Sequence, residues 1–367
     1  MKFKKILLIL LITCLIITPL GCGRKGQDDT NNTEPIIIIE EKDKVEEIDR
    51  GLGINPLTGL LIDEQFIDKR PVAVMINNLK AALPQSGISQ ADVIYETLAE
   101  GNITRMVALF QYPRVEKIGP IRSTRHYYID LALDHDAIFV HHGGSPQAFE
   151  AIKTLQPASI NSLSYLENTM AWRDPLRSKK RGMYEHSLYT SSEGIERAWK
   201  KLAYREERAR DLNLKFNFND EEDTPRGDRA EIIVVPFSNE YTSTFKYNQE
   251  SKLYERFQFG EPHIDENNGD QIRVKNIIIQ YANIKHIPGD PEGRRNIDLV
   301  DSGNGLYISN KKAVPIIWEK RGHKIPTEYR DAYGNILKIN KGKTWVCIFP
   351  KDKNVILKEF EESGVGE

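Results

Sequence analysis

The sequence predicts an α/β (α+β) fold, in which a mixed-sheet layered N-terminal domain with helices precedes a smaller, mainly β C-terminal domain. Short apolar runs alternate with helical stripes between residues 71 and 202, which is typical of layered α/β domains. A turn at Glu100-Gly101-Asn102 separates two apolar runs and predicts an antiparallel hairpin. From Glu231 onward, strand-like runs separated by turns dominate the sequence.

The first 22 residues have the layout of a signal peptide. Three lysines lie among the first five residues, and Ile6–Leu20 is an apolar run that is short for a spanning helix. Gly21 before Cys22 resembles the lipobox of bacterial lipoproteins, although Pro19 stands where that pattern has leucine. We therefore predict lipidation at Cys22, for example with palmitate; the alternative is an uncleaved anchor helix. Both alternatives place the remaining chain outside the cytoplasm. With lipidation at Cys22, the chain is a lipid-anchored protein of the cell membrane.

The predicted domain plan has three further parts. Residues 23–50 are polar and mostly acidic, so they bury too little apolar surface to fold and form a disordered tether. Within them Ile36–Ile39 is either a docking strand or a sticky patch, and the sequence does not decide between these. Residues 51–220 form the α/β domain, and residues 231–355 form the β-rich C-terminal domain.

The elements of the first domain follow in order. Pro71–Asn78 is a short apolar strand, and Ala91–Gln111 contains the two hairpin strands. Pro120 suits the first position of a helix that continues to about Asp134. On the first hairpin strand, Asp92, Ile94 and Glu96 fall on one face, because side chains alternate along a strand.

A buried strand is then predicted at Ala137–Val140, followed by a helix with Ser145 as N-cap and Pro146 at its first position. Ser191–Leu212 reads as one charged amphipathic helix. The polar stretch 217–230 marks the boundary between the two domains. Strands of the second domain are predicted within residues 231–237, 244–257, 273–284, 305–309, 313–320 and 343–350.

Composition and missing motifs exclude several functions. With 51 Lys plus Arg against 53 Asp plus Glu, the net charge is -2, which gives no global case for nucleic-acid binding. Once the signal peptide is removed at Cys22, Cys347 has no partner for a disulfide, and its apolar run predicts a buried, inert thiol. No GxSxG, GxxxxGK[ST] or HExxH motif occurs, and no GxGxxG follows a strand, so common hydrolase, NTPase and dehydrogenase functions lose support.

One segment is typical of an anion site. "HHGGSP" places a glycine turn (Gly143, Gly144) and a helix start at Ser145 beyond the end of a strand, where α/β sheets bind ligands and helix N-termini favour anions. Four arginines precede this segment and are expected to converge on a phosphate, pyrophosphate or carboxylate: Arg105, Arg114, Arg122 and Arg125. The alternative is that the turn only caps a helix and the arginines form a solvated face.

Further candidates lie beside this segment. His141 and His142 point to opposite faces of a strand, so one of them is expected to contact the anion or donate a proton, and no metal is predicted. The stretch from Ala171 to Ser191 reads as a long loop that supplies the other wall of the pocket. Its candidates are Arg173, Arg181 and His186, and the carboxylates expected near the arginines are Asp92, Glu96 and Asp174.

The segments "RPVAVMINN", "ADVIYETLAEG", "TRMVALF", "IGPIRSTR" and "HHGGSP", with the later "PTEYRDAYGN" and "KGKTWVCIFP", resemble the YerB-like bacterial lipoproteins. The resemblance covers about Asn55 to Pro350 and implies a lipid-anchored protein with a two-part domain of unknown function. A weaker, fold-level likeness is to the LytR-CpsA-Psr enzymes, which transfer polymers from polyprenyl pyrophosphate. That likeness implies roles at a pyrophosphate for five positions: Asp92, Arg105, Arg114, Arg122 and Arg125.

Three functions remain open at this stage. The first is a protein that binds an anionic envelope ligand on the arginine-rich pocket. The second is a scaffold for another envelope protein, in which the arginines form structural salt bridges. The third is a phosphoryl or glycosyl-phosphate transferase acting on a lipid-linked precursor, with Asp92 or Glu96 as base or metal ligand. No cofactor is predicted, except a divalent metal if the third function holds.

Overall fold

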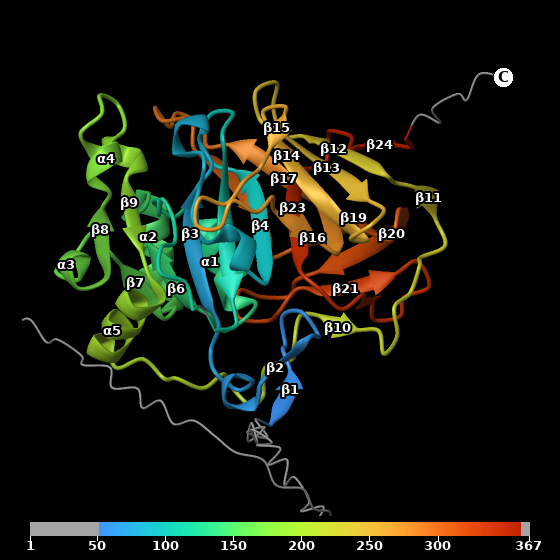
Figure 1. Ribbon diagram of the computed structural model, residues 1–367, viewed down its shortest axis with the longest axis horizontal. Helices are drawn as coiled ribbons and strands as arrows, with labels where there is room; N and C mark the ends of the chain where they lie inside the picture. The colour runs from blue at the N-terminus through green and yellow to red at the C-terminus, as the bar shows by residue number, and fades with distance from the viewer. Residues whose placement is uncertain (1–50, 113, 361–367) are drawn as a thin grey trace, which may run out of the picture. The chain divides into compact units, whose positions relative to one another are not determined.

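The computed structural model describes residues 51–112 and 114–360, which belong to one compact unit (Figure 1). The predictions for the signal peptide, for Cys22, for the tether and for Ile36–Ile39 lie outside the described residues. No helix in the described ranges is long and apolar enough to cross a membrane.

A twelve-stranded mixed sheet forms the centre of this unit. In spatial order its main path is β11 (Asp228–Arg229), β20 (Lys312–Glu319), β19 (Ser302–Ser309), β17 (Asn276–His286), β23 (Thr344–Pro350), β4 (Val93–Leu98), β5 (Thr104–Phe110), β3 (Val72–Asn77), β6 (Ile138–His141) and β7 (Ser159–Asn161). Two further strands extend it, β18 (Arg295–Asp298) on β17 and β21 (Glu328–Asp331) on β20.

A second sheet of six antiparallel strands contains β15 (Glu261–Pro262), β14 (Leu253–Gln258), β13 (Thr242–Asn248), β12 (Ile232–Pro236), β24 (Ile356–Lys358) and β16 (Arg273–Val274). Three two-stranded pairs complete the β structure: β1 (Leu52–Ile54) with β2 (Leu61–Asp63), β8 (Ala171–Arg173) with β9 (Leu188–Thr190), and β10 (Asn217–Phe218) with β22 (Lys338–Ile339).

The helices among the described residues are short and lie between residues 64 and 202. The α-helices are α1 (His126–Leu133), α2 (Pro146–Leu155), α3 (Glu167–Met170), α4 (Pro175–Ser178) and α5 (Ser192–Leu202). The 3₁₀ helices are η1 (Glu64–Phe66), η2 (Lys80–Ala82), η3 (Ile88–Gln90) and η4 (Tyr184–His186).

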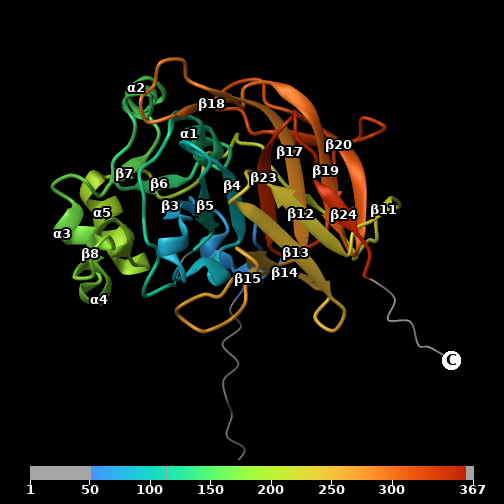
Figure 2. The same ribbon diagram turned by 90° about the horizontal axis from the view of Figure 1, so that it is seen from above.

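The large sheet is buried on both faces, which gives two hydrophobic cores. On one face, alternate residues of β3 such as Ala73 and Met75 pack with the apolar side of α1. On the other face, Val72 and Val74 belong to the core that contains the second sheet and α5. Figures 1 and 2 show β12, β13 and β14 lying across the β4–β23–β17 part of the large sheet. Burial on both faces explains why these strands read as continuous apolar runs.

Strand β23 joins the two halves of the chain. It lies between β17 and β4 and pairs parallel with both, so that Cys347 faces Ile279 on one side and Glu96 on the other. The boundary predicted between residues 220 and 231 therefore falls inside one compact unit. The β-rich character predicted for the C-terminal region is confirmed, as is the mixed α/β sheet of the N-terminal region.

The predicted hairpin and one predicted helix start are present in the structure, whereas the other helix start is not. The hairpin between β4 and β5 is present, and Ser145 caps α2 by accepting from the backbone N–H of Ala148. The predicted helix start at Pro120 is wrong. The backbone N–H groups of Ile121 and Arg122 donate to Leu188 and Met75, as in a strand, and α1 begins only at His126.

Two more predictions are corrected. The helix predicted over Ser191–Leu212 ends at Leu202, because Ala203 adopts the left-handed conformation and residues 206 and 208 pair with residues 68–70. The stretch 171–191 is not only a loop, since β8 and β9 pair across it and α4 and η4 lie between them.

Candidate functional site

Most of the predicted site residues lie along one edge of the large sheet. Strands β3 and β6 run parallel, and β3 and β4 are both antiparallel to β5, so the C-terminal ends of β3, β4 and β6 meet at one edge. Arg105 lies at the beginning of the antiparallel strand β5 and so at the same edge. Edges of this kind are where open α/β sheets bind ligands.

A clamp around Glu100 occupies part of this edge. Arg125 donates from Nε and Nη2 to Glu100 Oε2, at 3.0 and 2.7 Å, and Arg105 pairs with Glu100 Oε1. Arg105 also donates to the carbonyl of Ser123 at 2.8 Å. Burial and the neighbouring Arg125 lower the pKa of Arg105 to about 10. Both guanidinium groups therefore tie the hairpin to the segment before α1.

A second group of side chains lies beside the clamp and is more open. It comprises Arg122, His142, Arg173, Tyr184 and Glu185 and is called the edge cluster below. Arg122 pairs with the exposed Glu185 at 2.5 Å, and Arg173 donates to the Tyr184 carbonyl at 2.8 Å. The guanidinium carbon of Arg173 lies 3.9 Å from the centre of the Tyr184 ring.

The edge cluster carries unused hydrogen-bond donors. The Nε atoms of Arg122 and Arg173 are buried, and neither has a hydrogen-bond partner among residues 51–112 and 114–360. The Nη2 atom of Arg173 lies 3.5 Å from Nε2 of His142. Burial and the positive charges of Arg173 and Arg122 lower the pKa of His142, so this ring is neutral near pH 7. Within the edge cluster, Arg122 is the group that bonds to the carboxylate of Glu185, whereas Arg173 bonds to the Tyr184 carbonyl.

His141 and the glycine turn serve the fold. The two ring nitrogens of His141 bond to the Gly143 carbonyl at 2.8 Å and to Ser159 Oγ at 2.7 Å. Burial lowers the pKa of His141 to about 4. The N–H of Gly143 donates to Asn161 Oδ1, and the hydroxyl of Ser145 caps α2. Gly144 is packed against Thr124. The turn therefore satisfies much of its own hydrogen bonding.

The carboxylates expected near the arginines lie elsewhere. Asp92 precedes β4, at the opposite edge of the sheet from Arg105, and accepts from Asn55 and from the backbone of Gln111. Glu96 points to the opposite sheet face from Arg105, because residues of β4 and β5 alternate between the two cores. The expected approach of both carboxylates to the edge arginines is therefore wrong.

Glu96 instead anchors a buried polar network between the two sheets. It accepts from Arg256 at 3.1 Å, from Ser243 Oγ at 2.7 Å and from Trp345 Nε1 at 3.2 Å. Arg256 is fully buried, and its Nη1 also bonds to His263. Sequence reasoning missed this network because Arg256 lies 160 residues after Glu96.

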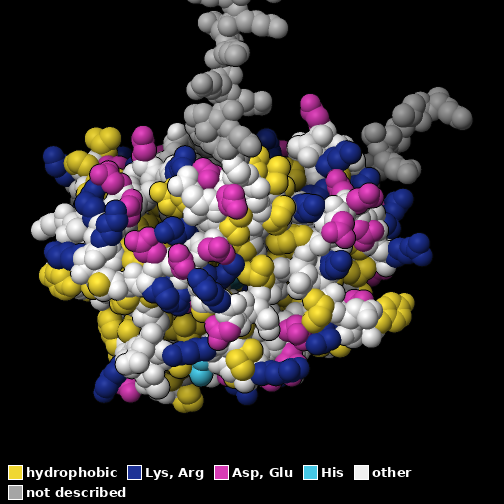
Figure 3. All heavy atoms as spheres, turned by 90° about the horizontal axis from the view of Figure 1, so that it is seen from below, with side chains coloured by type: hydrophobic (Ala, Val, Ile, Leu, Met, Phe, Trp, Pro, Cys, Tyr) yellow, Lys and Arg dark blue, Asp and Glu magenta, His cyan; other side chains and the backbone are white. Residues whose placement is uncertain are grey.

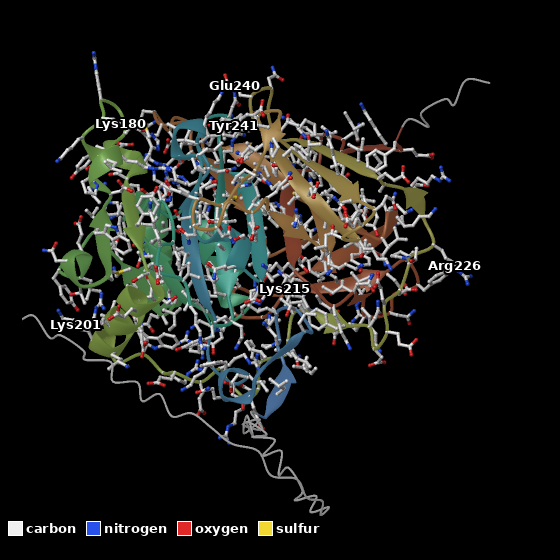
Figure 4. The ribbon with its side chains drawn as sticks, viewed as in Figure 1. Lys180, Lys201, Lys215, Arg226, Glu240 and Tyr241 are labelled. Atoms are coloured by element: carbon white, nitrogen blue, oxygen red, sulfur yellow. The ribbon has the colours of Figure 1, made fainter. Side chains whose placement is uncertain are left out.

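Three other candidates are also separate from the edge cluster. Arg114 lies over the rings of Phe66 and Tyr112, at 5.0 and 5.4 Å. Asp174 pairs with Lys117 at 3.1 Å and caps α4. Arg181 is exposed in the loop after α4, next to Lys180, whose side chain extends away from the body in Figure 4.

The selected residue His186 is buried and bonds through Nδ1 to Asn77 at 2.9 Å. The structure adds Glu185 and Glu100, two residues that the sequence analysis did not select. Glu185 lies next to His186 and pairs with Arg122. Glu100 lies five residues before Arg105 in the hairpin turn, so the predicted hairpin already placed the two close together. The described residues contain no group of three or more His, Cys, Asp or Glu arranged to hold a metal ion.

Comparison with known proteins gives a consistent picture. Residues 57–205 match the "Protein of unknown function (DUF3048) N-terminal domain", and residues 233–346 match its C-terminal domain. The "Putative lipoprotein YerB" of Bacillus subtilis (strain 168) is 33% identical over 318 residues, which are 86% of this chain and 91% of that protein. A crystal structure of the YerB protein from Bacillus subtilis has a TM-score of 0.72 and 31% identity, covering 84% of this chain and all of that one.

Proposed function

The chain belongs to the DUF3048 family, whose description assigns no activity, and we propose a function from its edge cluster. The protein is lipid-anchored outside the cytoplasm, and it binds a phosphate-bearing ligand of the cell envelope. The anchor is supported by the signal-peptide layout that ends at Cys22 and by the similarity to the "Putative lipoprotein YerB" of Bacillus subtilis. Replacing Cys22 by Ser should remove the lipid mass from the chain, and an unchanged mass would contradict lipidation at this residue.

The observation that carries the binding proposal is the pair of unused Nε donors on Arg122 and Arg173. Buried donors without partners cost free energy, and an oxyanion with several oxygens can accept from both guanidinium groups. Arginine forks match phosphate and carboxylate oxygens through paired hydrogen bonds.

The single carboxylate of the edge cluster is displaceable. The side chain of Glu185 is 66% exposed, against 19% for Arg122. Exposed ion pairs contribute little to stability, so a phosphate can take the place of Glu185 on Arg122 at small cost. The neutral ring of His142 then adds a hydrogen bond rather than a charge.

The scaffold alternative is favoured by a different observation. Arg105 and Arg125 are buried on Glu100 and on backbone carbonyls, as expected of structural residues. The transferase alternative loses its base, because Asp92 and Glu96 are held away from the edge arginines.

The test is a thermal-shift titration of residues 23–367 with inorganic phosphate and pyrophosphate. A ligand that binds the native state at about 100 times its Kd adds about 2.7 kcal/mol of stability, a rise of several degrees in Tm. We expect this rise in the wild type and in Arg197→Ala, a control at an exposed arginine of α5. It should be lost in Arg122→Ala and in Arg173→Ala.

Equal shifts in all four proteins, or none in the wild type, would contradict the binding proposal. If Arg125→Ala lowers Tm strongly while no protein responds to the anions, the scaffold alternative gains.

A further inference from the structure

A separate cavity of about 480 Å³ lies at the opposite edge of the large sheet from the edge cluster. One wall is the face of α5 that carries Glu196, Trp199 and Lys200, and the other is formed by residues 65–70 and 111–112. Figure 4 marks this end of the molecule by Lys201, on α5, far from Lys180 beyond α4. The volume falls in the range of small-molecule sites, about 300–1,000 Å³.

Aromatic rings line both walls. Phe66 and Tyr112 stack face to face, with their ring centres 3.8 Å apart at 13°. Phe66 is buried, so Tyr112, which is 40% exposed, is the ring of this wall that is open to a ligand. On the α5 side, the indole N–H of Trp199 donates to the Tyr204 carbonyl at 3.0 Å, which fixes the orientation of the half-buried ring. A partly exposed ring that a stacking partner or a hydrogen bond holds in place contacts a ligand at low cost in entropy.

The charges around the cavity are already paired. Lys69 bonds to Glu206 at 2.7 Å, Lys200 bonds to Glu196 at 2.6 Å, and Arg70 pairs with Asp136 at 3.0 Å. Figure 3 shows basic and acidic side chains interspersed on the face that carries this end of the molecule, without a region of one sign. Each lysine and arginine that lines the cavity therefore has a carboxylate partner.

From this combination we propose that the cavity is a carbohydrate site, which binds a neutral sugar ring between Trp199 and Tyr112. A sugar ring presents apolar C–H groups on its faces and hydroxyls around its rim. Its faces would lie on the aromatic walls, and its hydroxyls would donate to the carboxylates of Glu196 and Glu206. The proposal is independent of the proposed anion binding, because the two sites share no residue.

The experiment measures binding of a chitin tetrasaccharide to residues 23–367 by calorimetry and by tryptophan fluorescence. Trp318 and Trp345 are buried at 1% and 0% exposure, so a sugar-dependent change in emission comes from Trp199 or Trp172. Trp172 is 40% exposed on β8, away from the cavity, and Trp172→Ala is the matched control. Tyr112→Ala tests the other wall in case Trp199→Ala alters folding.

We expect saturable binding by the wild type and by Trp172→Ala. Trp199→Ala and Tyr112→Ala should each bind about tenfold more weakly, a fold-change that corresponds to about 1.4 kcal/mol. The proposal is overturned by unchanged affinity in Tyr112→Ala, by the absence of saturable binding to the wild type, or by tighter binding of a planar aromatic probe such as adenosine at the same residues.

Discussion

Replacing Asp134 by Asn should destabilise the protein more than any surface substitution. The side chain of Asp134 is fully buried at the end of α1, and it holds the ammonium groups of Lys215 and Lys320, which are 0% and 1% exposed. Its oxygens also accept from the backbone N–H and the hydroxyl of Thr327, at 3.1 and 2.8 Å. Lys215, labelled in Figure 4, comes from the segment between α5 and β10 and is buried.

The magnitude follows from the charge left behind. Burial alone would raise the pKa of Asp134, but Lys215 and Lys320 more than reverse this, and its pKa lies well below the usual value. Asn cannot neutralise either ammonium group, and breaking a buried ion pair costs about 3–5 kcal/mol. That is a large share of the roughly 5–15 kcal/mol by which domains are stable.

A charge count inside the cluster sharpens the prediction. Lys215→Met leaves one carboxylate and one ammonium group, which is a neutral pair, so it should cost less than Asp134→Asn. Urea unfolding followed by tryptophan fluorescence measures both, with Glu196→Gln as a control in an exposed ion pair. If Asp134→Asn were no more destabilising than Glu196→Gln, or less so than Lys215→Met, the reasoning would be refuted.

Three further predictions concern single residues. Burial lowers the pKa of His141 to about 4 from the ordinary 6.5. The stability that the neutral ring of His141 contributes should therefore be complete above pH 6.5 and be lost as the pH falls toward 4. Over this range Tm should fall less in His141→Asn than in the wild type. Burial raises the pKa of the Cys347 thiol, so a thiol reagent should label it only in the unfolded protein, and rapid labelling of the native protein would contradict this. Ser145→Ala should lower the free energy of unfolding by about 1 kcal/mol through loss of the α2 cap, whereas Ser145→Asp, which keeps an acceptor, should not.

Local structure was predictable where neighbouring residues determine it. The Ser145-Pro146 helix start and the turn at Gly101 depend on a few adjacent residues, and both occur in the structure. Pro120 failed as a helix start because the N–H of Arg122 bonds to Met75 of β3 and the N–H of Ile121 bonds to Leu188, far along the chain. A sequence pattern read along the chain contains no information about such partners.

Long-range pairing also limited the prediction of the site. Side-chain alternation correctly placed Ile94 and Glu96 on one face of β4, but the sequence does not state what covers that face. The answer is the second sheet, which brings Arg256 to Glu96. Strand β23 pairs with β4, and this pairing brings the indole N–H of Trp345 to the carboxylate of Glu96. Glu96 thus acts between the sheets, although it was expected at the arginine edge.

The arginines of the edge can be separated by how their donors are used. Arg105 and Arg125 bond to Glu100 and to backbone carbonyls, so their replacement should reduce stability whether or not a ligand binds. Arg122 and Arg173 each keep a buried Nε without a partner in the described part of the chain, and a ligand would supply that partner. Replacing a structural arginine changes Tm in the absence of ligand. Replacing a binding arginine changes the rise in Tm that the ligand causes. If Arg122→Ala lowered Tm as much as Arg125→Ala and left the phosphate-induced shift intact, Arg122 would join the structural group, and the edge would lose its case as an anion site.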